Sequence, residues 1–437
     1  MQRRSIYVSA CLMALGAAHL PACSESKTKT DSPAATATAT GTATATADAA
    51  RTLVVNTDAS DPAPKAAIEA AARSFEAANP GVTVKINTFD HEGYKTSIRN
   101  FLTADPPDVA LWYAGNRMAP FVEAGLFDDV TDLWTGEGLD DKLTAAAASM
   151  TIDGKKWGVP YTYYQWGIYY RKDIFDQHGL QEPRTWAELL AVCAKLEAAK
   201  VTPFAIGTRA PWPAGGWFDY LDLRVNGYEF HMELTSGKVP YTDPRVQAVF
   251  DRWDEIVKPG YYLDNHPSYQ WQEALPAFVK GEAAMFLMGN FAVAPMREAG
   301  LKDEQIGFMQ FPEITPGIPR AEDAPTDTMH IPSKAKNKDD ARKFLAHVAR
   351  ADVQTKMNEI LGQLPVNREA QRPNDKFLSA GFTMLSGAHA LAQFYDRDAP
   401  PEMAKAGMDG FQRYMLKPGE RAQILEQLEQ VRQRVYK

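Results

Sequence analysis

The chain has few cysteines and no surplus of positive charge. It contains three cysteines, of which only Cys193 lies beyond residue 23, so the folded part cannot form an internal disulfide. Its 47 lysines and arginines are outnumbered by 55 aspartates and glutamates, and the net charge of −8 argues against a nucleic-acid partner. After the N-terminal region, no apolar run is long enough to predict a transmembrane helix.

Motifs for common catalytic and metal chemistry are also missing. The chain contains no HExxH, GxxxxGKS/T, GxSxG or GxGxxG motif, and its eight histidines form no pair at helical spacing. The acidic run from Phe127 to Asp141 lacks the glycine and glutamate positions of an EF-hand loop, so we interpret it as a solvated loop with helix caps. The sequence therefore predicts no catalytic residue, no metal and no cofactor.

The N-terminus has the pattern of an export signal. Arginines at positions 3 and 4 precede an apolar run over residues 6–20, which is too short to span a membrane. The run ends in Leu20-Pro21-Ala22-Cys23, which resembles the lipobox of bacterial lipoproteins. Residues 1–23 are therefore predicted to be a lipoprotein signal peptide with lipidation at Cys23, the alternative being a plain secretory signal. Residues 24–51, where alanine and threonine alternate, have too little large apolar surface to fold and predict a disordered tether.

From residue 52 onward, strand patterns alternate with helix patterns. Apolar or alternating runs predict strands at residues 52–56, 82–86 and 107–112, with amphipathic helices between them. A Thr185-Glu188 capping box starts a later helix, and residues 419–436 have the pattern of a C-terminal helix. This alternation predicts an α/β fold with a mainly parallel sheet, and the length allows about two or three domains.

One stretch, WGVPYTYYQWGIYY over residues 157–170, is unusually aromatic, with seven aromatic side chains in fourteen residues. A strand points alternate residues to opposite faces, so one row of rings could pack while the other faces a cleft. Tyr and Trp combine a flat apolar face with a polar group. The stretch therefore predicts either a core strand or a site for a flat ligand rich in hydroxyls.

Four groups of motifs resemble the bacterial family-1 extracellular solute-binding proteins, which include the maltose-binding-protein type. FVKGEAAM at residues 278–285, followed by MGNF at 288–291, is similar to the family motif FxxGxAAM…GxW/F. The other stretches fit the family in the expected order; they are residues 107–109 with 125–130, 154–160 with 170–173, and 326–328 with 331–332 and 341–345. The resemblance covers residues 52–437.

The resemblance implies a fold of two α/β lobes, of the class II periplasmic-binding-protein type, with a ligand cleft between the lobes. Crossings between lobes are expected near residues 159–166, 284–289 and 350. Lobe 1 would consist of residues 52–161 and 288–350, and lobe 2 of residues 162–287 and 351–437. The implied protein is a monomer in the bacterial cell envelope, exported and lipid-anchored to a membrane, and it serves the permease transmembrane subunits of an ABC importer.

The ligand implied by the resemblance is a sugar or oligosaccharide, captured by lobe closure without catalysis. A sugar needs Trp or Tyr rings beside directed polar groups, and such clusters occur where the family's cleft loops fall. The predicted ligand-binding residues are Trp112, Tyr113, Asn116, Tyr163, Tyr164, Gln165, Trp212, Trp217, Asp219, Trp271, Asn290, Asp327, Thr328 and Gln363.

Two alternatives remain open at this stage. A secreted carbohydrate-active hydrolase would use two carboxylates about 5 to 10 Å apart, such as Asp219 or Asp327 with a partner. A receptor of the same fold could instead bind ferric ion through the adjacent Tyr163 and Tyr164. The abundance of tryptophan near the expected cleft favours a sugar.

The two halves of the aromatic stretch should respond differently to mutation. Tyr164→Ala should weaken ligand binding, because this residue is expected at the cleft edge of the first crossing. Tyr170→Ala should chiefly lower stability, because its ring is expected to pack inside the second lobe. Ligand titration and thermal unfolding of both variants separate these effects, and an equal loss of affinity in both would contradict the division.

Overall fold

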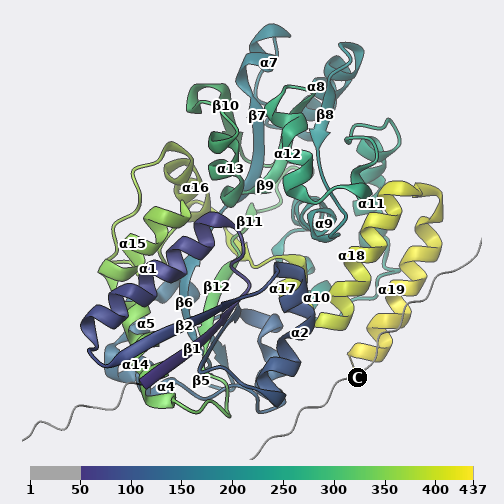
Figure 1. Cartoon of the computed structure of the whole chain (residues 1–437). Coiled ribbons are helices and arrows are strands. Elements are labelled where there is room, and N and C mark those ends of the chain that lie inside the picture. The colour runs from purple at the N-terminus through teal and green to yellow at the C-terminus, as the bar shows by residue number, and fades with distance from the viewer. Residues whose placement is uncertain (1–50, 437) are drawn as a thin grey trace, which may run out of the picture. The chain divides into compact units, whose positions relative to one another are not determined.

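Two β-sheets carry the part of the chain that the computed structural model describes, residues 51–436 (Figure 1). The first sheet consists, in spatial order, of β2 (Val82–Thr88), β1 (Arg51–Thr57), β3 (Val109–Tyr113), β12 (Thr326–His330) and β6 (Val159–Tyr163). The second sheet consists of β10 (Ile306–Met309), β7 (Trp166–Arg171), β9 (Ala283–Gly289) and β8 (Thr202–Ala205). Two short pairs are β4 (Thr151–Ile152) with β5 (Lys155–Lys156), and β11 (Ala321–Asp323) with β13 (Ala390–Ala392).

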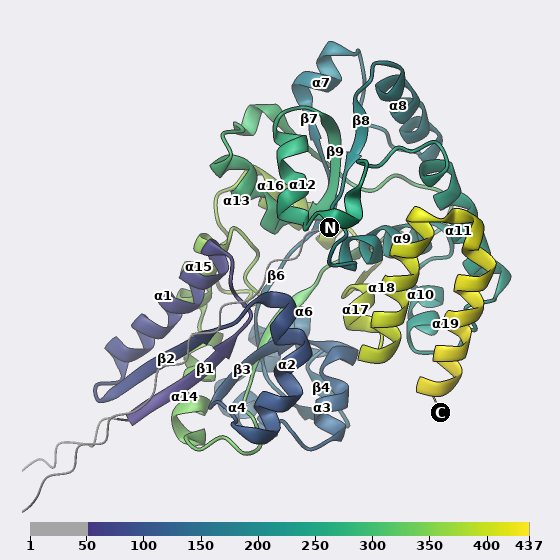
Figure 2. The same cartoon turned by 45° about the vertical axis from the view of Figure 1, so that its right-hand side comes forward.

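The helices fall into two groups, one with each sheet (Figures 1 and 2). With the first sheet are α1 (Pro62–Ala78), α2 (His91–Ala104), α3 (Ala119–Glu123), α4 (Thr131–Glu137), α5 (Leu139–Lys142), α6 (Thr144–Ala147), α14 (Lys338–Ala349) and α15 (Ala351–Leu361). With the second are α7 (Lys172–Gln177), α8 (Trp186–Ala198), α9 (Trp212–Val225), α10 (Tyr228–Thr235), α11 (Pro244–Val257), α12 (Trp271–Val279), α13 (Val293–Glu298), α16 (Lys376–Ser386), α17 (Tyr395–Asp398), α18 (Pro401–Leu416) and α19 (Arg421–Val435).

Local sequence signals account for where several helices begin and end. Thr185 caps α8 by accepting the N–H of Glu188, whose side chain bonds back to the cap backbone, so the predicted capping box is confirmed. The long helical pattern that ends at residue 361 is broken at Arg350, whose ψ of 145° is extended, and it forms α14 and α15. Cys193 is buried in α8, and burial raises the pKa of its thiol well above the ordinary value.

Each sheet has its own hydrophobic core. The first-sheet core includes Phe75 of α1, whose ring meets the Phe344 ring edge-on at 5.1 Å, and α1 packs against α15 (Figure 1). The second-sheet core includes Phe218, which stacks on Phe411 with ring centroids 4.2 Å apart. The C-terminal helices α18 and α19 lie side by side in both views, and α18 packs on α9 (Figure 2). The separate cores agree with the predicted division into two α/β bodies.

The expectation of mainly parallel sheets is only partly correct. β1 runs parallel to β2 and β3, and β8 runs parallel to β9. In contrast, β12 is antiparallel to both β3 and β6, and β7 is antiparallel to both β9 and β10. Strands that return from the other body enter each sheet in the opposite direction, and local periodicity carries no signal for such returns.

The chain also crosses between the sheets at places that differ from the predicted boundaries. The first crossing joins β6 to β7. After β9, however, residues 306–309 form β10 and pair with β7, so the chain stays with the second sheet. The return follows β11, and α15 buries Val353 and Met357 in the first-sheet core rather than starting the second body. Strand pairing and core packing, which decide these crossings, depend on residues far apart in sequence.

None of the described helices combines the length and the apolar character needed to cross a membrane. The predicted signal peptide, the lipidation at Cys23 and all but the last residue of the predicted tether lie outside the described residues. Arg51, assigned by prediction to the tether, is the first residue of β1.

Candidate functional site

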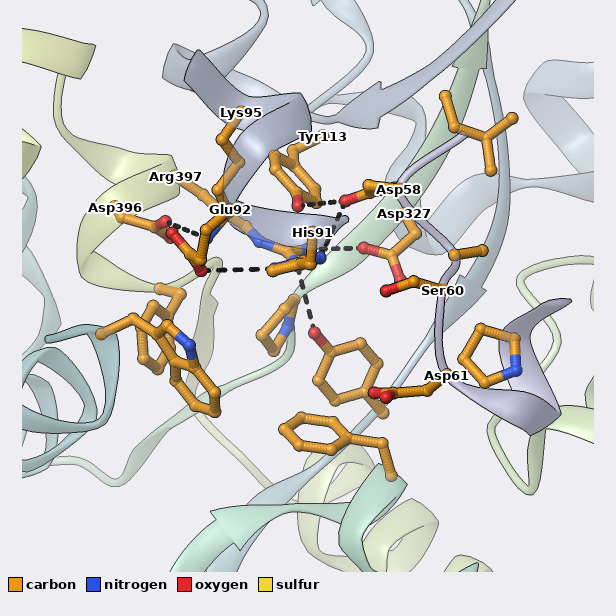
Figure 3. Close-up of a pocket in the computed structure, with 18 of the residues that line it drawn as sticks. Asp58, Ser60, Asp61, His91, Glu92, Lys95, Tyr113, Asp327, Asp396 and Arg397 are labelled. Atoms are coloured by element: carbon orange, nitrogen blue, oxygen red, sulfur yellow. Dashed lines mark hydrogen bonds and ion pairs between the residues drawn. The ribbon is translucent and has the colours of Figure 1, made fainter. Parts of the chain in front are cut away.

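A cavity of about 310 Å³ lies at one edge of the first sheet, and the second sheet's elements close its other side (Figure 3). The parallel strands β1 and β3 both end at this edge. Asp58 directly follows β1, and Tyr113 is the last residue of β3. The carboxyl ends of strands are the usual ligand edge of an open α/β sheet. Because β12 runs antiparallel to β3, its beginning lies at the same edge and brings Asp327 there.

Asp58 is the centre of a hydrogen-bonded group on the first-sheet side (Figure 3). Its Oδ2 accepts the Tyr113 hydroxyl at 2.7 Å and lies 3.0 Å from His91 Nδ1. Burial by itself raises the pKa of Asp58, but the hydrogen bonds and charge of His91, with the Tyr113 hydroxyl, hold this pKa below its ordinary value. Lys95 Nζ lies 3.5 Å from Asp396 Oδ2, which adds a second charged pair nearby.

Arg397, from α17, occupies the middle of the polar wall (Figure 3). Its guanidinium lies 4.1 Å from the centre of the Tyr113 ring, its Nη1 lies 2.9 Å from Asp327 Oδ1, and its Nη2 donates to the Tyr164 hydroxyl at 3.1 Å. Burial raises the pKa of Asp327, and the positive charge of Arg397 opposes that rise. The cation therefore favours the ionised form of Asp327, which burial disfavours.

The second-sheet side of the cavity is aromatic. Trp166, Trp212, Trp271, Phe291 and Phe394 line it. The Trp166 ring centre lies 4.8 Å from that of Phe394 and 5.9 Å from that of Trp212, with the two indoles nearly perpendicular. Trp166 Nε1 is buried and has no hydrogen-bond partner within residues 51–436, although a buried indole N–H normally finds one.

Half of the predicted site residues line this cavity. They are Trp112, Tyr113, Tyr164, Trp212, Trp271, Asp327 and Gln363. Trp112 is only 2% exposed and its Nε1 already donates to the Arg117 carbonyl oxygen at 3.0 Å, so its part in the wall is small. Tyr170, expected to pack in the second body, lies in the second-sheet core beside Phe175.

The other seven predicted residues lie away from the cavity. They are Asn116, Tyr163, Gln165, Trp217, Asp219, Asn290 and Thr328. Tyr163 points to the opposite side from Tyr164, and Thr328 pairs with His330 at 2.6 Å on the other face of β12 from Asp327. Tyr163 and Thr328 therefore lie on the opposite face from the cavity, because side chains alternate between the two faces of an extended chain.

Trp217 and Asp219, both predicted to bind ligand, lie in the segment PWPAGGWFDY at residues 211–220. This segment opens α9, a helix buried on nearly all sides, and Trp217 packs into the second-sheet core against Phe204 and Tyr262. Asp219 accepts the backbone N–H of Tyr395 at 2.7 Å. The side chains of Gln165 and Asn290 are also buried, and Gln165 Nε2 donates a hydrogen bond to Asn290 Oδ1 at 2.8 Å.

The sequence prediction missed most of the polar wall. Asp58 and His91 follow strands that the sequence did predict, and their place after strand ends was a usable signal. Asp396 and Arg397 had no such signal, because only the return of the C-terminal segment brings α17 to this edge. Phe394 was missed for the same reason, whereas Phe291 follows the end of β9 and its place in MGNF was a usable signal.

The structure gives little support to the two alternative chemistries. Asp219 lies outside the cavity, so it forms no catalytic pair with Asp327 there. Tyr163 and Tyr164 line different cavities, and burial raises the pKa of the Tyr164 phenol well above its ordinary value, which disfavours a phenolate ligand. Across residues 51–436, no group of three His, Cys, Asp or Glu side chains is arranged to hold a metal ion.

Two α/β bodies with a cavity lined from both define a ligand-binding protein of the two-lobe class, and comparison with known proteins gives the family. Residues 29–355 match the family model described as bacterial extracellular solute-binding protein. The chain belongs to this family, and the predicted two-lobe fold is confirmed.

Individual relatives agree with this assignment. An uncharacterised ABC transporter extracellular-binding protein of Pyrococcus horikoshii is 29% identical over 70% of this chain and 69% of its own length. The multiple sugar-binding protein of Streptococcus mutans is 26% identical over 66% and 69%, respectively. The solved structure of AcbH, a bacterial solute receptor described as having an exclusive substrate preference for β-D-galactopyranose, is 28% identical with a TM-score of 0.82, covering 89% of this chain and 100% of that one.

Trp217 should contribute to stability rather than to ligand binding. Removing a fully buried Trp side chain leaves a cavity, so Trp217→Ala should lower the free energy of unfolding by about 3–5 kcal/mol. Trp212→Ala, at a partly buried position, should cost less. Urea unfolding of both variants measures the difference, and a smaller loss for Trp217→Ala would contradict its place in the core.

Asp58 should make stability depend on pH in the acid range. Because its folded-state pKa is lowered, its stabilising contribution is present above the ordinary pKa of about 3.9 and is lost as the pH falls below that value. Asp58→Asn should therefore be less stable than the wild type at neutral pH, with a difference that shrinks toward pH of about 3. Urea unfolding at both pH values tests this, and a difference independent of pH would contradict it.

Proposed function

We propose that the protein binds a sugar in this cavity and serves as the receptor of an ABC importer. One arrangement carries the proposal: a wall of indole and phenyl rings faces a wall of carboxylates and cations across about 310 Å³. A pyranose ring has C–H faces that stack on aromatic rings and hydroxyls that need directed polar partners. The two walls offer both kinds of contact to one ligand.

The size of the cavity and the relatives support a small sugar. Ligand sites commonly enclose about 300–1,000 Å³, so this cavity is at the small end of that range. A monosaccharide or a short oligosaccharide suits it. AcbH and the Streptococcus mutans protein are both described as binding sugars, and galactose is therefore the first candidate ligand.

In the proposed complex, each wall has a distinct role. The Trp212 ring stacks on a C–H face of the sugar. Asp58 and Asp327 accept hydrogen bonds from hydroxyls, and Arg397 favours the ionised form of Asp327. No covalent step is proposed, because the family consists of solute-binding proteins.

Closure of the lobes is the proposed mode of capture. Ligand contacts from both lobes stabilise the closed arrangement more than an open one, and this difference shifts the population. Asp61 and Gln272 already approach across the cavity, with Gln272 Nε2 3.4 Å from Asp61 Oδ1. From the sheets and cores, we place lobe 1 at residues 51–163 and 326–361, and lobe 2 at residues 166–323 and 377–436.

The cellular setting is part of the proposal. The lipobox pattern at residues 20–23 and the extracellular solute-binding family support an exported monomer that is anchored to a membrane through Cys23. The Ala/Thr-rich segment would then hold the lobes away from the membrane. The closed receptor would present its sugar to the permease transmembrane subunits.

Galactose and related sugars should bind with an affinity that depends on the aromatic wall. Trp212→Ala should weaken binding about tenfold, because it removes the stacking ring together with its buried apolar surface. Trp157→Ala is the matched control, since Trp157 lies outside the cavity and its Nε1 donates to the Ile152 carbonyl oxygen. Calorimetric titration with a panel of mono- and oligosaccharides, supported by intrinsic Trp fluorescence, measures both variants.

Two outcomes would contradict the proposal. If no sugar in the panel binds while a solute of another class does, the ligand class is wrong. If a sugar binds but Trp157→Ala and Trp212→Ala lose affinity equally, the sugar does not occupy this cavity.

A further inference from the structure

A second cavity, of about 270 Å³, lies on the other side of the segments that border the first. Thr326 lines the second cavity and Asp327 the first; Tyr163 and Tyr164 divide in the same way, as do Asp398 and Arg397. Residues of both lobes contribute, including Ser149 from the first and Met232 of α10 from the second. The proposed sugar site makes no use of this cavity.

Asp398 supplies an unused acceptor in the second cavity. Its side chain is 4% exposed, and its Oδ2 accepts the backbone N–H groups of Gln393 at 2.9 Å and Phe394 at 3.3 Å. Its Oδ1 has no hydrogen-bond partner within the described chain, although Asp398 lines the cavity. This oxygen is not among the fully buried unpaired atoms of the described residues, so a donor from outside the protein can reach it.

Several buried carboxyl groups lie behind Asp398. The cations among them are Arg224, His231 and Arg397, and the carboxyl groups, Asp398 included, are Asp219, Asp222, Glu322, Asp323 and Asp398. Arg224 is committed to Glu322 at 2.6 Å, and His231 to Asp222 at 3.0 Å. Neither oxygen of Asp323 has a hydrogen-bond partner within the described residues. Burial and mutual repulsion raise the pKa values of Asp219, Asp323 and Asp398, and a positive charge in the cavity would favour their ionised forms.

The remaining lining suits an ammonium group with an apolar body. Asn116 Nδ2 donates to the Asp398 carbonyl oxygen at 2.6 Å, which leaves the Asn116 amide oxygen as a further acceptor. The rings of Tyr163 and Tyr228 can lie over a cation, and Met232 and other apolar side chains can contact an alkyl chain. We propose that the second cavity binds a protonated primary alkylamine, whose ammonium group donates to Asp398 Oδ1 and to the Asn116 amide oxygen.

The charge of Asp398 makes this binding depend on pH. Burial raises the pKa of Asp398, while the nearby positive charge of His231 opposes the rise. Asp219, Asp323 and Arg397 also act on this region electrostatically. An alkylamine stays protonated up to pH of about 10, so its affinity should rise with pH as Asp398 ionises.

The test is calorimetric titration of the whole chain with butylammonium chloride, with butanol as the neutral analogue and sodium chloride as the ionic-strength control. Asp398→Asn keeps an oxygen for the Gln393 and Phe394 N–H groups but removes the charge, and it should weaken butylammonium binding about tenfold or more. Ala148→Tyr, at an exposed lining position, should block the cavity without changing its charge. Asp396→Asn, which alters the first cavity instead, is the matched control and should retain amine binding.

Loss of binding in Asp398→Asn and Ala148→Tyr, with retention in Asp396→Asn, would support the site. Circular dichroism and thermal unfolding show whether each variant is folded. If Asp398→Asn does not fold, the amine affinity of Ala148→Tyr tests the proposal. Three outcomes would each overturn the proposal. Butylammonium could fail to bind at millimolar concentration, butanol could bind equally well, or Ala148→Tyr could bind butylammonium as well as the wild type does. Sugar titration is a separate measurement, so neither result depends on the other.

Discussion

The antiparallel insertion of β12 between β3 and β6 is the constraint on which the site depends. Four strands of the first sheet, β1, β2, β3 and β6, end at the cavity edge, and a strand running the opposite way must begin there. That reversal places Asp327 beside the residues that follow β1 and β3. It also ties the segment arriving from the second lobe into the middle of the first sheet. One pairing therefore fixes both the polar wall and the connection between lobes.

The buried charge of Arg397 joins the C-terminal segment to that edge. Arg397 contacts Asp327, the Tyr113 ring and the Tyr164 hydroxyl, which belong to three different strands or their ends. A buried guanidinium without partners would be strongly destabilising, so α17 is held where these partners are. The same geometry keeps Asp327 available as an acceptor. Stability of the fold and polarity of the site thus depend on one group of contacts.

The two cavities show how alternation of side chains divides function along a single segment. Neighbouring residues such as Tyr163 and Tyr164 face opposite sides, one toward each cavity. The first cavity has paired carboxylates and free aromatic faces, which suit a neutral polyhydroxylated ligand. In the second cavity, one oxygen of Asp398 has no partner within the described residues, which suits the proposed cation. Asp398 is the one acidic residue among the described residues that line the second cavity, whereas six acidic residues line the first.

The sequence by itself determined the class of fold and the family, and seven of its fourteen predicted site residues line the cavity. Strand and helix periodicity, the capping box and the FVKGEAAM motif are local signals, and they need no knowledge of distant contacts. Only the tertiary structure decided that Trp217 is core, that residues 306–309 pair with β7, and that Asp396 and Arg397 reach the cavity. These outcomes depend on strand direction and on packing between segments far apart in the chain. The aromatic stretch at residues 157–170 contains both core residues and cavity-lining residues. The face of the strand on which a side chain lies decides which of the two it is.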